Sequence, residues 1–307
     1  MSAGNVIPAV EADGIVAAKE LPEILTAPRT RKGPIGFAIR HPAIAIGGAV
    51  LGTMLLIAIF APILGTVDPT QLATWKRTRP PSAANWFGTD LLGRDIYSRI
   101  LYGARVSIIV GFSVALCASM AGLAVGLVSG TVRWADGLIM RTIDGMMSIP
   151  PILLAVALMA LTRGSVGNVI LAITIAEAPR VARLVRSVVL TLREQPYVEA
   201  AIAAGTRTPM IILRHILPNT LAPLTVQATY ICASAMIVES ILSFIGAGIP
   251  PITPSWGNIM AEGRGLWEIK PFIVMFPALF LSITVLSVNL LGDGLRDALD
   301  PRMAKRL

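Results

Sequence analysis

The sequence predicts an all-α integral membrane protein with six transmembrane helices. Its residues are 54% hydrophobic and 14% charged, and its mean hydropathy of +0.72 does not suit a soluble domain. Five long apolar runs carry this bias, each near or above the roughly 18 to 20 residues that a helix needs to cross the hydrocarbon. The runs are Pro42 to Leu64, Val106 to Val132, Gly145 to Thr162, Asn219 to Val238 and Pro271 to Gly292.

The remaining span is weaker. Its apolar run, Gly164 to Ala176, is cut by Glu177 and Pro179 before apolar residues resume. Three arginines then follow at three-residue spacing on one helical ridge, where they can reach the headgroups while their apolar neighbours stay in lipid or protein. A five-span arrangement that omits this segment is the alternative. The three arginines are Arg180, Arg183 and Arg186.

The charge pattern orients the chain. A net charge of +8 would suggest nucleic acid as the partner of a soluble protein, but in a membrane protein basic residues set the topology. With six spans and the N-terminus inside, most Lys and Arg residues fall on the inner side. We therefore expect a multi-pass protein with both termini in the cytoplasm, membrane lipid around it and no nucleic-acid partner.

Three regions follow along the chain. Residues 1–35 are polar and lack periodicity, which predicts a disordered cytoplasmic tail rather than a signal peptide. Residues 36–105 contain the first span and a long outer segment. Residues 106–307 form a five-helix core, interrupted on the inner side by a charged segment at 190–218.

The outer segment predicts a helix that rests on the membrane interface. Asp95 and Arg99 are four residues apart and can pair, while neighbouring apolar residues lie toward one side. Asp90 and Asp95 could also be metal ligands, but two acids without a His or Cys cluster are more often helix caps and ion-pair partners. The apolar residues of this helix are Ile96, Ile100 and Leu101.

The second span carries a ridge of small residues. They recur at strict four-residue spacing, so they share one helix face and allow another backbone to approach closely. This span is therefore expected to pack against protein. The ridge consists of Ala118, Gly122, Gly126 and Gly130.

Two other spans contain polar or helix-breaking residues. Span three begins with Arg141 and Asp144, which can pair, and its two adjacent prolines should bend it. The bend could line a translocation path. Alternatively, it could be a simple kink whose free backbone carbonyls bond to neighbouring helices. An acid at the end of span five either contacts a moving solute or pairs with a base. The candidate path residues are Asp144, Pro150, Pro151, Glu239 and Ser243.

No catalytic, cofactor or metal site is predicted. Both cysteines, Cys117 and Cys232, lie in apolar spans, and neither a metalloprotease nor a serine-hydrolase motif is present. The sequence also contains no phosphate-binding GxxxxGK[ST] loop, so ATP could not be bound in that way. Energy for any transport must come from another polypeptide or an ion gradient.

The stretch YVEAAIAAGTRTPMIILRHILPN interrupts the apolar chain between spans four and five. Val198, Ala201, Ile202 and Gly205 share a helix face of small side chains, and Gly205 suits a left-handed helix stop. Thr208 is the expected cap of a new helix whose first turn contains Pro209. A second short helix, Met210 to Ile216, is expected to end at Leu217 and Pro218. The sequence therefore predicts two short helices joined by a glycine turn on the inner side.

Three functions compete for this pair of helices. A DNA-binding helix-turn-helix held between closely spaced spans could hardly reach a major groove. A helix lying on the lipid surface would need larger apolar residues than this face offers. A small-residue face that begins near Glu199 is better suited to a cleft in another protein.

The pattern of Glu199, Ala200, Ala201 and Gly205 followed by Ile216 to Pro218 resembles the cytoplasmic signature of the permease subunits of bacterial ABC importers. Three further stretches resemble the C-type permease of the dipeptide, oligopeptide and nickel importers, which has a type I importer fold. They are FGTDLLGRDIYSRILYGARVSI from Phe87, ESILSFIGAGIPPITPSWGNIM from Glu239 and NLLGDGLRDALDPR from Asn289.

This resemblance implies a non-enzymatic subunit that forms half of a translocation path in the bacterial inner membrane. Its partners would be a homologous B-type permease, two ATPase subunits that hold ATP and Mg, and an extracytoplasmic substrate-binding protein. Peptides or nickel chelates would be the substrates. A gradient-driven secondary transporter is the alternative. The residues expected to couple to an ATPase are Glu199, Ala200, Ala201, Ile202, Gly205, Thr206 and Arg207.

Overall fold

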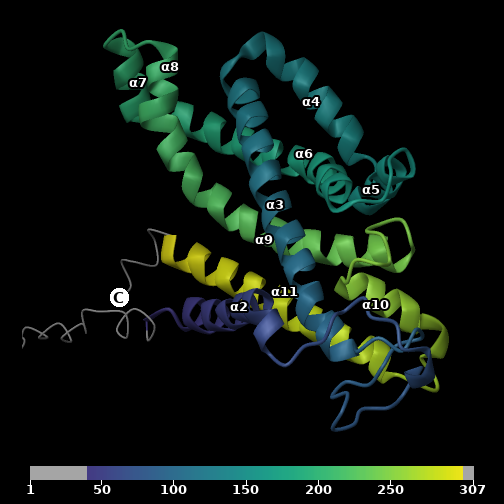
Figure 1. Cartoon of the computed structure of the whole chain (residues 1–307). Coiled ribbons are helices and arrows are strands. Elements are labelled where there is room, and N and C mark those ends of the chain that lie inside the picture. The colour runs from purple at the N-terminus through teal and green to yellow at the C-terminus, as the bar shows by residue number, and fades with distance from the viewer. Residues whose placement is uncertain (1–39, 300–307) are drawn as a thin grey trace, which may run out of the picture. The chain divides into compact units, whose positions relative to one another are not determined.

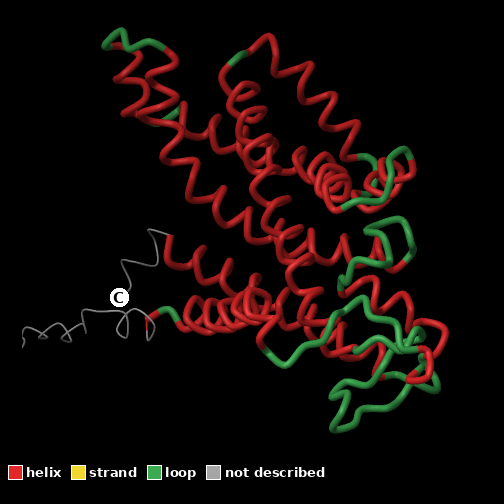
Figure 2. The backbone as a smooth tube through the Cα atoms, viewed as in Figure 1, coloured by secondary structure: helices red, strands yellow, loops and turns green. Residues whose placement is uncertain are grey.

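The computed structural model describes residues 40–299, which are mainly helical and contain no strand (Figures 1 and 2). The tail expected at residues 1–35 lies outside this range. The π-helical turn Ile212–Ile216 (η4) joins two of the helices. The helices are α2 (Pro42–Phe60), α3 (Ile96–Thr131), α4 (Arg133–Met147), α5 (Pro151–Ala160), α6 (Val166–Arg193), α7 (Pro196–Ala203), α8 (Thr208–Ile211), α9 (Leu217–Phe244), α10 (Trp256–Gly263) and α11 (Phe272–Leu299).

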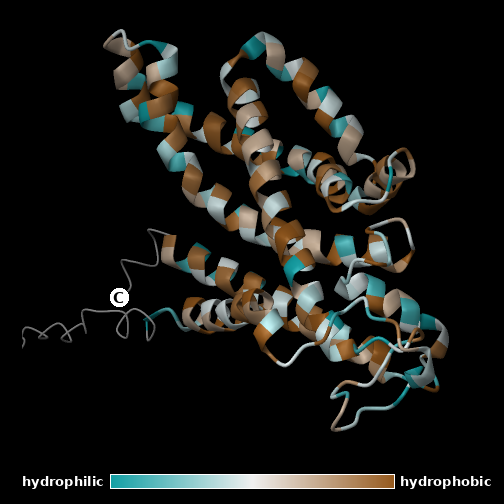
Figure 3. Ribbon diagram, viewed as in Figure 1, coloured by the Kyte–Doolittle hydropathy of each residue, from teal (hydrophilic) through white to brown (hydrophobic). Residues whose placement is uncertain are grey.

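The long helices agree with the predicted all-α membrane fold, and their number is close to the six predicted spans. Among the described residues, four continuous segments are long and apolar enough to span a membrane, and the pair α4 and α5, bent by 86°, supplies a fifth. Figure 3 shows hydrophobic residues along these helices. Helix α6, which contains the weaker predicted span, has 28 residues and is not among these apolar segments. The four segments are Pro42–Ile63, Ile96–Thr131, Thr208–Phe244 and Phe272–Leu299.

The bend between α4 and α5 occurs at the two adjacent prolines, Pro150 and Pro151. Pro150 is the N-cap residue of α5 and Pro151 begins that helix. Because proline has no N–H and its ring clashes with the preceding turn, α4 cannot continue through this pair. The predicted bend is therefore confirmed as a break between two helices.

The helix α3 packs against both α6 and α9 and crosses them in Figure 1. Its glycine ridge faces three valines of α6 at the same four-residue spacing. A Cβ atom added to Gly126 would lie 2.6 Å from Cβ of Val185 and 2.7 Å from the carbonyl oxygen of Ala182. Gly122 meets Val181 and Gly130 meets Val189 in the same way. The predicted close approach is confirmed, with α6 as the partner.

The helix α3 also differs from its prediction. Ile96, Ile100 and Leu101 belong to its first turns and are buried, so the separate interfacial helix expected there was wrong. These residues pack beneath α10 and the preceding loop in a cluster that includes Trp256 and Ile259. The sequence suggested that this face of α3 would meet the membrane interface. Contacts from distant parts of the chain cover it instead.

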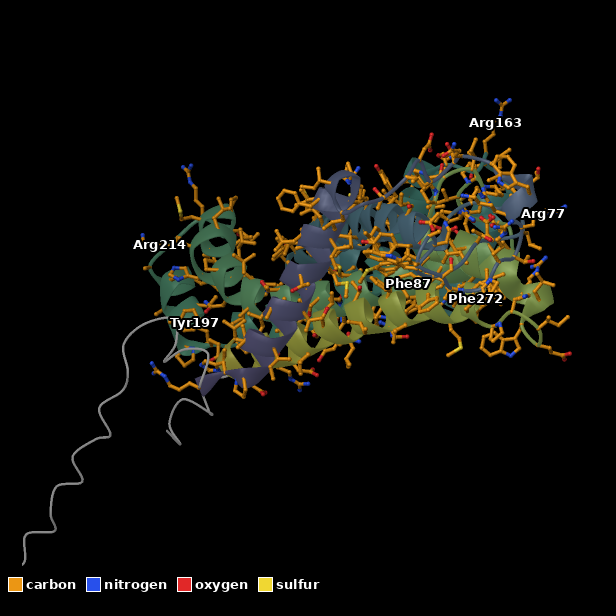
Figure 4. All side chains as sticks on the ribbon, turned by 60° about the horizontal axis from the view of Figure 1, so that its bottom comes forward. Arg77, Phe87, Arg163, Tyr197, Arg214 and Phe272 are labelled. Carbon is orange, nitrogen blue, oxygen red and sulfur yellow. The ribbon has the colours of Figure 1, made fainter. Side chains whose placement is uncertain are left out.

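The helical unit has two ends that carry different residues. Figure 4 shows Tyr197 and Arg214 at one end, termed the α7 end, and Arg77 and Arg163 at the other, termed the α10 end. Helix α10 packs against α3, α9 and α11, and α11 also packs along α2. The α7 end is joined to α6 and α9, so α9 connects the two ends.

The α3–α6 contact predicts a large difference between two glycine substitutions. Gly126→Ala should lower the free energy of unfolding by about 1–3 kcal/mol, because the added methyl group overpacks the contact with Val185. Gly137→Ala on α4 is the matched control, since nothing lies within 4 Å of its added Cβ. Thermal unfolding of the detergent-solubilised protein measures both. Equal shifts in Tm would contradict the assignment of the α3–α6 contact.

Candidate functional site

The proposed coupling segment, residues 196–207, is a short helix with a glycine stop. Pro196 begins α7, and Val198 is fully buried and holds the helix against the body. Gly205 has a φ angle of +77°, its N–H donates to the carbonyl of Ile202 at 2.9 Å, and the N–H of Thr206 donates to Ala201 at 3.1 Å. These paired bonds around a left-handed residue form a Schellman motif, which confirms the predicted stop.

Most of the predicted coupling residues are accessible. Ile202 is 54% exposed and nothing lies within 4 Å of a Cβ added to Gly205, so this turn projects into open space. An exposed apolar residue next to small and charged ones suits contact with a protein surface. The exposed members are Glu199, Ala200, Ile202, Gly205 and Arg207, and the half-buried members are Ala201 and Thr206.

The second short helix differs from its prediction. Arg207 is the N-cap residue of α8 and no side chain caps the helix, so the capping role expected of Thr208 was wrong. The helix also does not end at Leu217 and Pro218, because α8 continues through the π-helical turn η4 into α9. A π turn widens the backbone spacing, which lets a residue without an N–H enter a continuous helix.

The α8 and η4 segment adds apolar surface beside α7. Met210 and Leu213 are exposed, as is Tyr197 at the start of α7. The Tyr197 ring lies 6.0 Å from the ring of His215, so the two short segments are in contact. The exposed surface at the α7 end therefore includes large apolar side chains as well as the small residues that the sequence emphasised.

Ion pairs tie α6 to α4. Asp144 accepts a hydrogen bond from Arg183 rather than pairing with Arg141, so the expected local pair was wrong. Arg186 makes two hydrogen bonds to Asp136, both of 2.6 Å. The two arginines predicted to reach the headgroups thus meet acids of another helix, which lowers the cost of carrying their charge near lipid.

The third arginine of the α6 ridge has a local partner. Arg180 donates to Glu177 at 2.9 Å, and Glu177 is buried although Arg180 is exposed. Ser234 of α9 lies 3.4 Å from the other carboxylate oxygen of Glu177. The acid that interrupted the predicted sixth span is therefore paired and faces α9.

Glu239 lies inside the protein. It is fully buried and accepts hydrogen bonds from Ser107 of α3 at 3.1 Å and from Ser243, one turn later on α9, at 2.9 Å. The structure thus brings together two of the five candidate path residues. Among the described residues, no hydrogen bond or ion pair joins them to Asp144, Pro150 or Pro151, which lie at the α4–α5 bend.

A buried cluster of four charges occupies the α10 end. Arg94 pairs with Asp90 at 2.7 Å and with Glu262 of α10 at 2.6 Å. Arg99 pairs with the same two acids, and its second contact with Glu262 is 3.0 Å. The cluster contains two charges of each sign. Asp95 instead caps α3 by accepting from the N–H of Ser98 at 2.8 Å.

These contacts account for Asp90 and Asp95 as an ion-pair partner and a helix cap. The residues that the structure describes contain no group of three or more potential metal ligands. Burial would raise the pKa of the Asp90 carboxyl, but Arg99, Arg94 and hydrogen bonds to Arg94 hold this pKa below its usual range. Glu262, which completes the cluster, was missed because it is 168 residues from Arg94 along the chain.

Comparison with known proteins first defines the class. The chain is 51% identical over 272 residues to a probable peptide ABC transporter permease protein of Sinorhizobium fredii, covering 89% of this chain and 93% of the relative. It is 43% identical to a dipeptide transport system permease protein of Alkalihalophilus pseudofirmus (84% and 85% covered) and 40% identical to a glutathione transport system permease protein of Pectobacterium atrosepticum (87% and 89%). It is therefore an ABC transporter permease.

The particular family follows from residues 118–305. They match the family described as the binding-protein-dependent transport system inner membrane component, and the chain belongs to this family. A solved structure of the MetNI methionine ABC transporter in an inward-facing conformation supports the fold. The match has a TM-score of 0.54 at 23% identity and covers 67% of this chain and 98% of that chain.

The charge cluster predicts a specific pH dependence of stability. Because the pKa of Asp90 is lowered in the folded state, its stabilisation is present above its unfolded pKa of about 3.9 and is lost as the pH falls through the lower folded value. Asp90→Asn should cost about 3–5 kcal/mol near neutral pH, because it leaves buried arginines partly unpaired. The measurement is Tm from pH 8 to 3.

The gap between the wild-type and Asp90→Asn curves should narrow as the pH falls below about 3.9. Glu268→Gln is the control, since Glu268 is exposed and its side chain makes none of the hydrogen bonds or ion pairs found among residues 40–299. Parallel curves for wild type and Asp90→Asn over the whole range would overturn the account of the cluster.

Proposed function

We propose that this chain is a permease subunit of an ATP-driven peptide importer, with both termini in the cytoplasm. It would pair with a homologous B-type permease, so that each forms half of the translocation path. Relatives named for peptides, dipeptides and glutathione support short peptides as the substrate class over nickel chelates. An extracytoplasmic binding protein would deliver the substrate.

The observation that carries this proposal is the exposed helix α7 with its left-handed stop at Gly205. It projects between two long helices, α6 and the continuous segment Thr208–Phe244. We assign it as the coupling helix that enters a cleft of an ATPase subunit, with ATP and Mg held by that partner. Displacement of α7 would then move both helices to which it is joined.

The mechanism follows from this connection. Closure of the ATPase pair on ATP would displace α7, and the attached helices would favour one of two arrangements of the path. We place Asp144, Pro150 and Pro151 along the path at the α4–α5 bend. Glu239 and Ser243 would contact substrate only in an arrangement that separates α3 from α9, since both are buried here.

Substitutions at Gly205 and Glu199 test the coupling assignment. Gly205→Val should cost about 1–2 kcal/mol locally because a β-branched residue disfavours left-handed φ; its displaced turn should reduce substrate-stimulated ATP hydrolysis several-fold. Gly205→Asn is the matched control, since Asn tolerates this conformation. Glu199→Arg should also reduce stimulation, by reversing an exposed charge. The measurement is ATP hydrolysis by the reconstituted importer with and without its loaded binding protein.

Uptake into proteoliposomes separates this proposal from a gradient-driven secondary transporter. The importer should require ATP and its ATPase partners. Uptake driven by a proton or sodium gradient without them would overturn the proposed function. Wild-type coupling in both Gly205→Val and Glu199→Arg would instead refute only the role of α7.

A further inference from the structure

The loop of residues 73–79 at the α10 end is hydrogen-bonded to the turn that precedes α3. The N–H of Thr78 donates to the carbonyl of Asp90 at 3.0 Å. The N–H of Arg79 donates to Thr89 Oγ1 at 2.9 Å, and the N–H of Thr89 donates back to the carbonyl of Arg79 at 3.0 Å. Since Asp90 belongs to the buried charge cluster, the loop is fixed to the core of this end.

The loop also contains a strained residue. Thr78 has a φ angle of +51°, the only positive φ among the non-glycine residues that the structure describes. A β-branched residue in this region is a genuine outlier, and such strain persists only where surrounding contacts over-determine it. Strain of this kind is concentrated at ligand clamps and other functional sites.

The fixed loop exposes one aromatic and two cationic side chains. Trp75 is 72% exposed, and Arg77 and Arg79 are also exposed. Arg77 donates to the carbonyl of Leu91 at 2.6 Å and Arg79 to the carbonyl of Trp75 at 3.2 Å. These bonds orient the guanidinium groups without neutralising them, because none of the ion pairs among residues 40–299 includes either arginine.

The position of this Trp75–Arg79 patch favours a protein partner over lipid. The apolar run of α3 begins at Val106, whereas α3 itself begins ten residues earlier at Ile96, about 15 Å along the helix axis. The patch is attached to the turn before Ile96, and Figure 4 shows Arg77 at the extremity of the α10 end. It therefore lies beyond the hydrocarbon-spanning part of α3.

We infer that the Trp75–Arg79 patch is a docking surface for an acidic face of the extracytoplasmic substrate-binding protein. This inference rests on the proposed function. Tryptophan and arginine are the residue types most often found at the energetic centres of protein interfaces. Uncompensated guanidinium groups accelerate encounter with a carboxylate-rich surface, and a pre-formed loop reduces the entropy lost on binding.

The test uses the complete importer in lipid nanodiscs with the purified binding protein that stimulates it. The double variant Arg77→Glu, Arg79→Glu should raise the binding-protein concentration for half-maximal ATPase stimulation by about tenfold at low salt, with a smaller effect at high salt. Basal ATP hydrolysis should not change. Trp75→Ala should weaken stimulation at both salt concentrations. Arg163→Glu is the matched control, because Arg163 is exposed at the same end and should have a much smaller effect.

Each contrary outcome identifies what has failed. Wild-type stimulation in the double variant, or an equal effect of Arg163→Glu, would overturn the docking surface and leave the proposed function standing. An effect on basal activity that depends on anionic lipid would show a lipid site instead, and loss of the partner permease on size-exclusion chromatography would show an interface between permeases. Absence of binding-protein stimulation in the wild-type importer would count against the proposed function itself.

Discussion

The close contact between α3 and α6 is the constraint on which the other features depend. Inside a bilayer no hydrophobic force draws helices together, so association relies on close van der Waals packing and polar contacts. The glycines of α3 accept the valines of α6 at a distance that no larger residue permits. At the end of this contact, Arg193 donates to the carbonyl of Gly130 at 2.8 Å. Helix α7 begins three residues later, so the glycine ridge helps to fix where α7 emerges.

Two groups of charged residues differ in whether an opposite charge is paired with them. Those of the α6 ridge and the Asp90–Glu262 cluster are matched by opposite charges, which makes them compatible with contact to lipid or burial in protein. Those of the α7 surface and the Trp75–Arg79 patch face solvent and lack acidic or basic partners in the described part of the chain. We place the two protein contacts at these unmatched surfaces, which lie at opposite ends of the helical unit (Figure 4).

Local sequence patterns predicted the features that depend on local geometry. Gly205 is recognisable because only glycine readily adopts the left-handed stop, and four-residue spacing of small residues identifies one helix face regardless of its partner. Features that depend on distant contacts were missed. The partner of Arg94 and Arg99 is Glu262 on another helix, and Asp144 pairs across to Arg183 rather than to nearby Arg141. The continuous helix through Pro218 requires a π turn, which no residue pattern specifies.

The central claim is that α7 is the surface on which an ATPase subunit acts when ATP drives a conformational change in this chain. A photo-crosslinking residue placed at Ile202 in the assembled importer tests this contact most directly, with the same residue at exposed Leu161, in the α5–α6 loop, as the reference. We predict an adduct with an ATPase subunit from position 202 and none from position 161. An adduct from position 202 with the binding protein or lipid alone, and none with an ATPase subunit, would contradict the account.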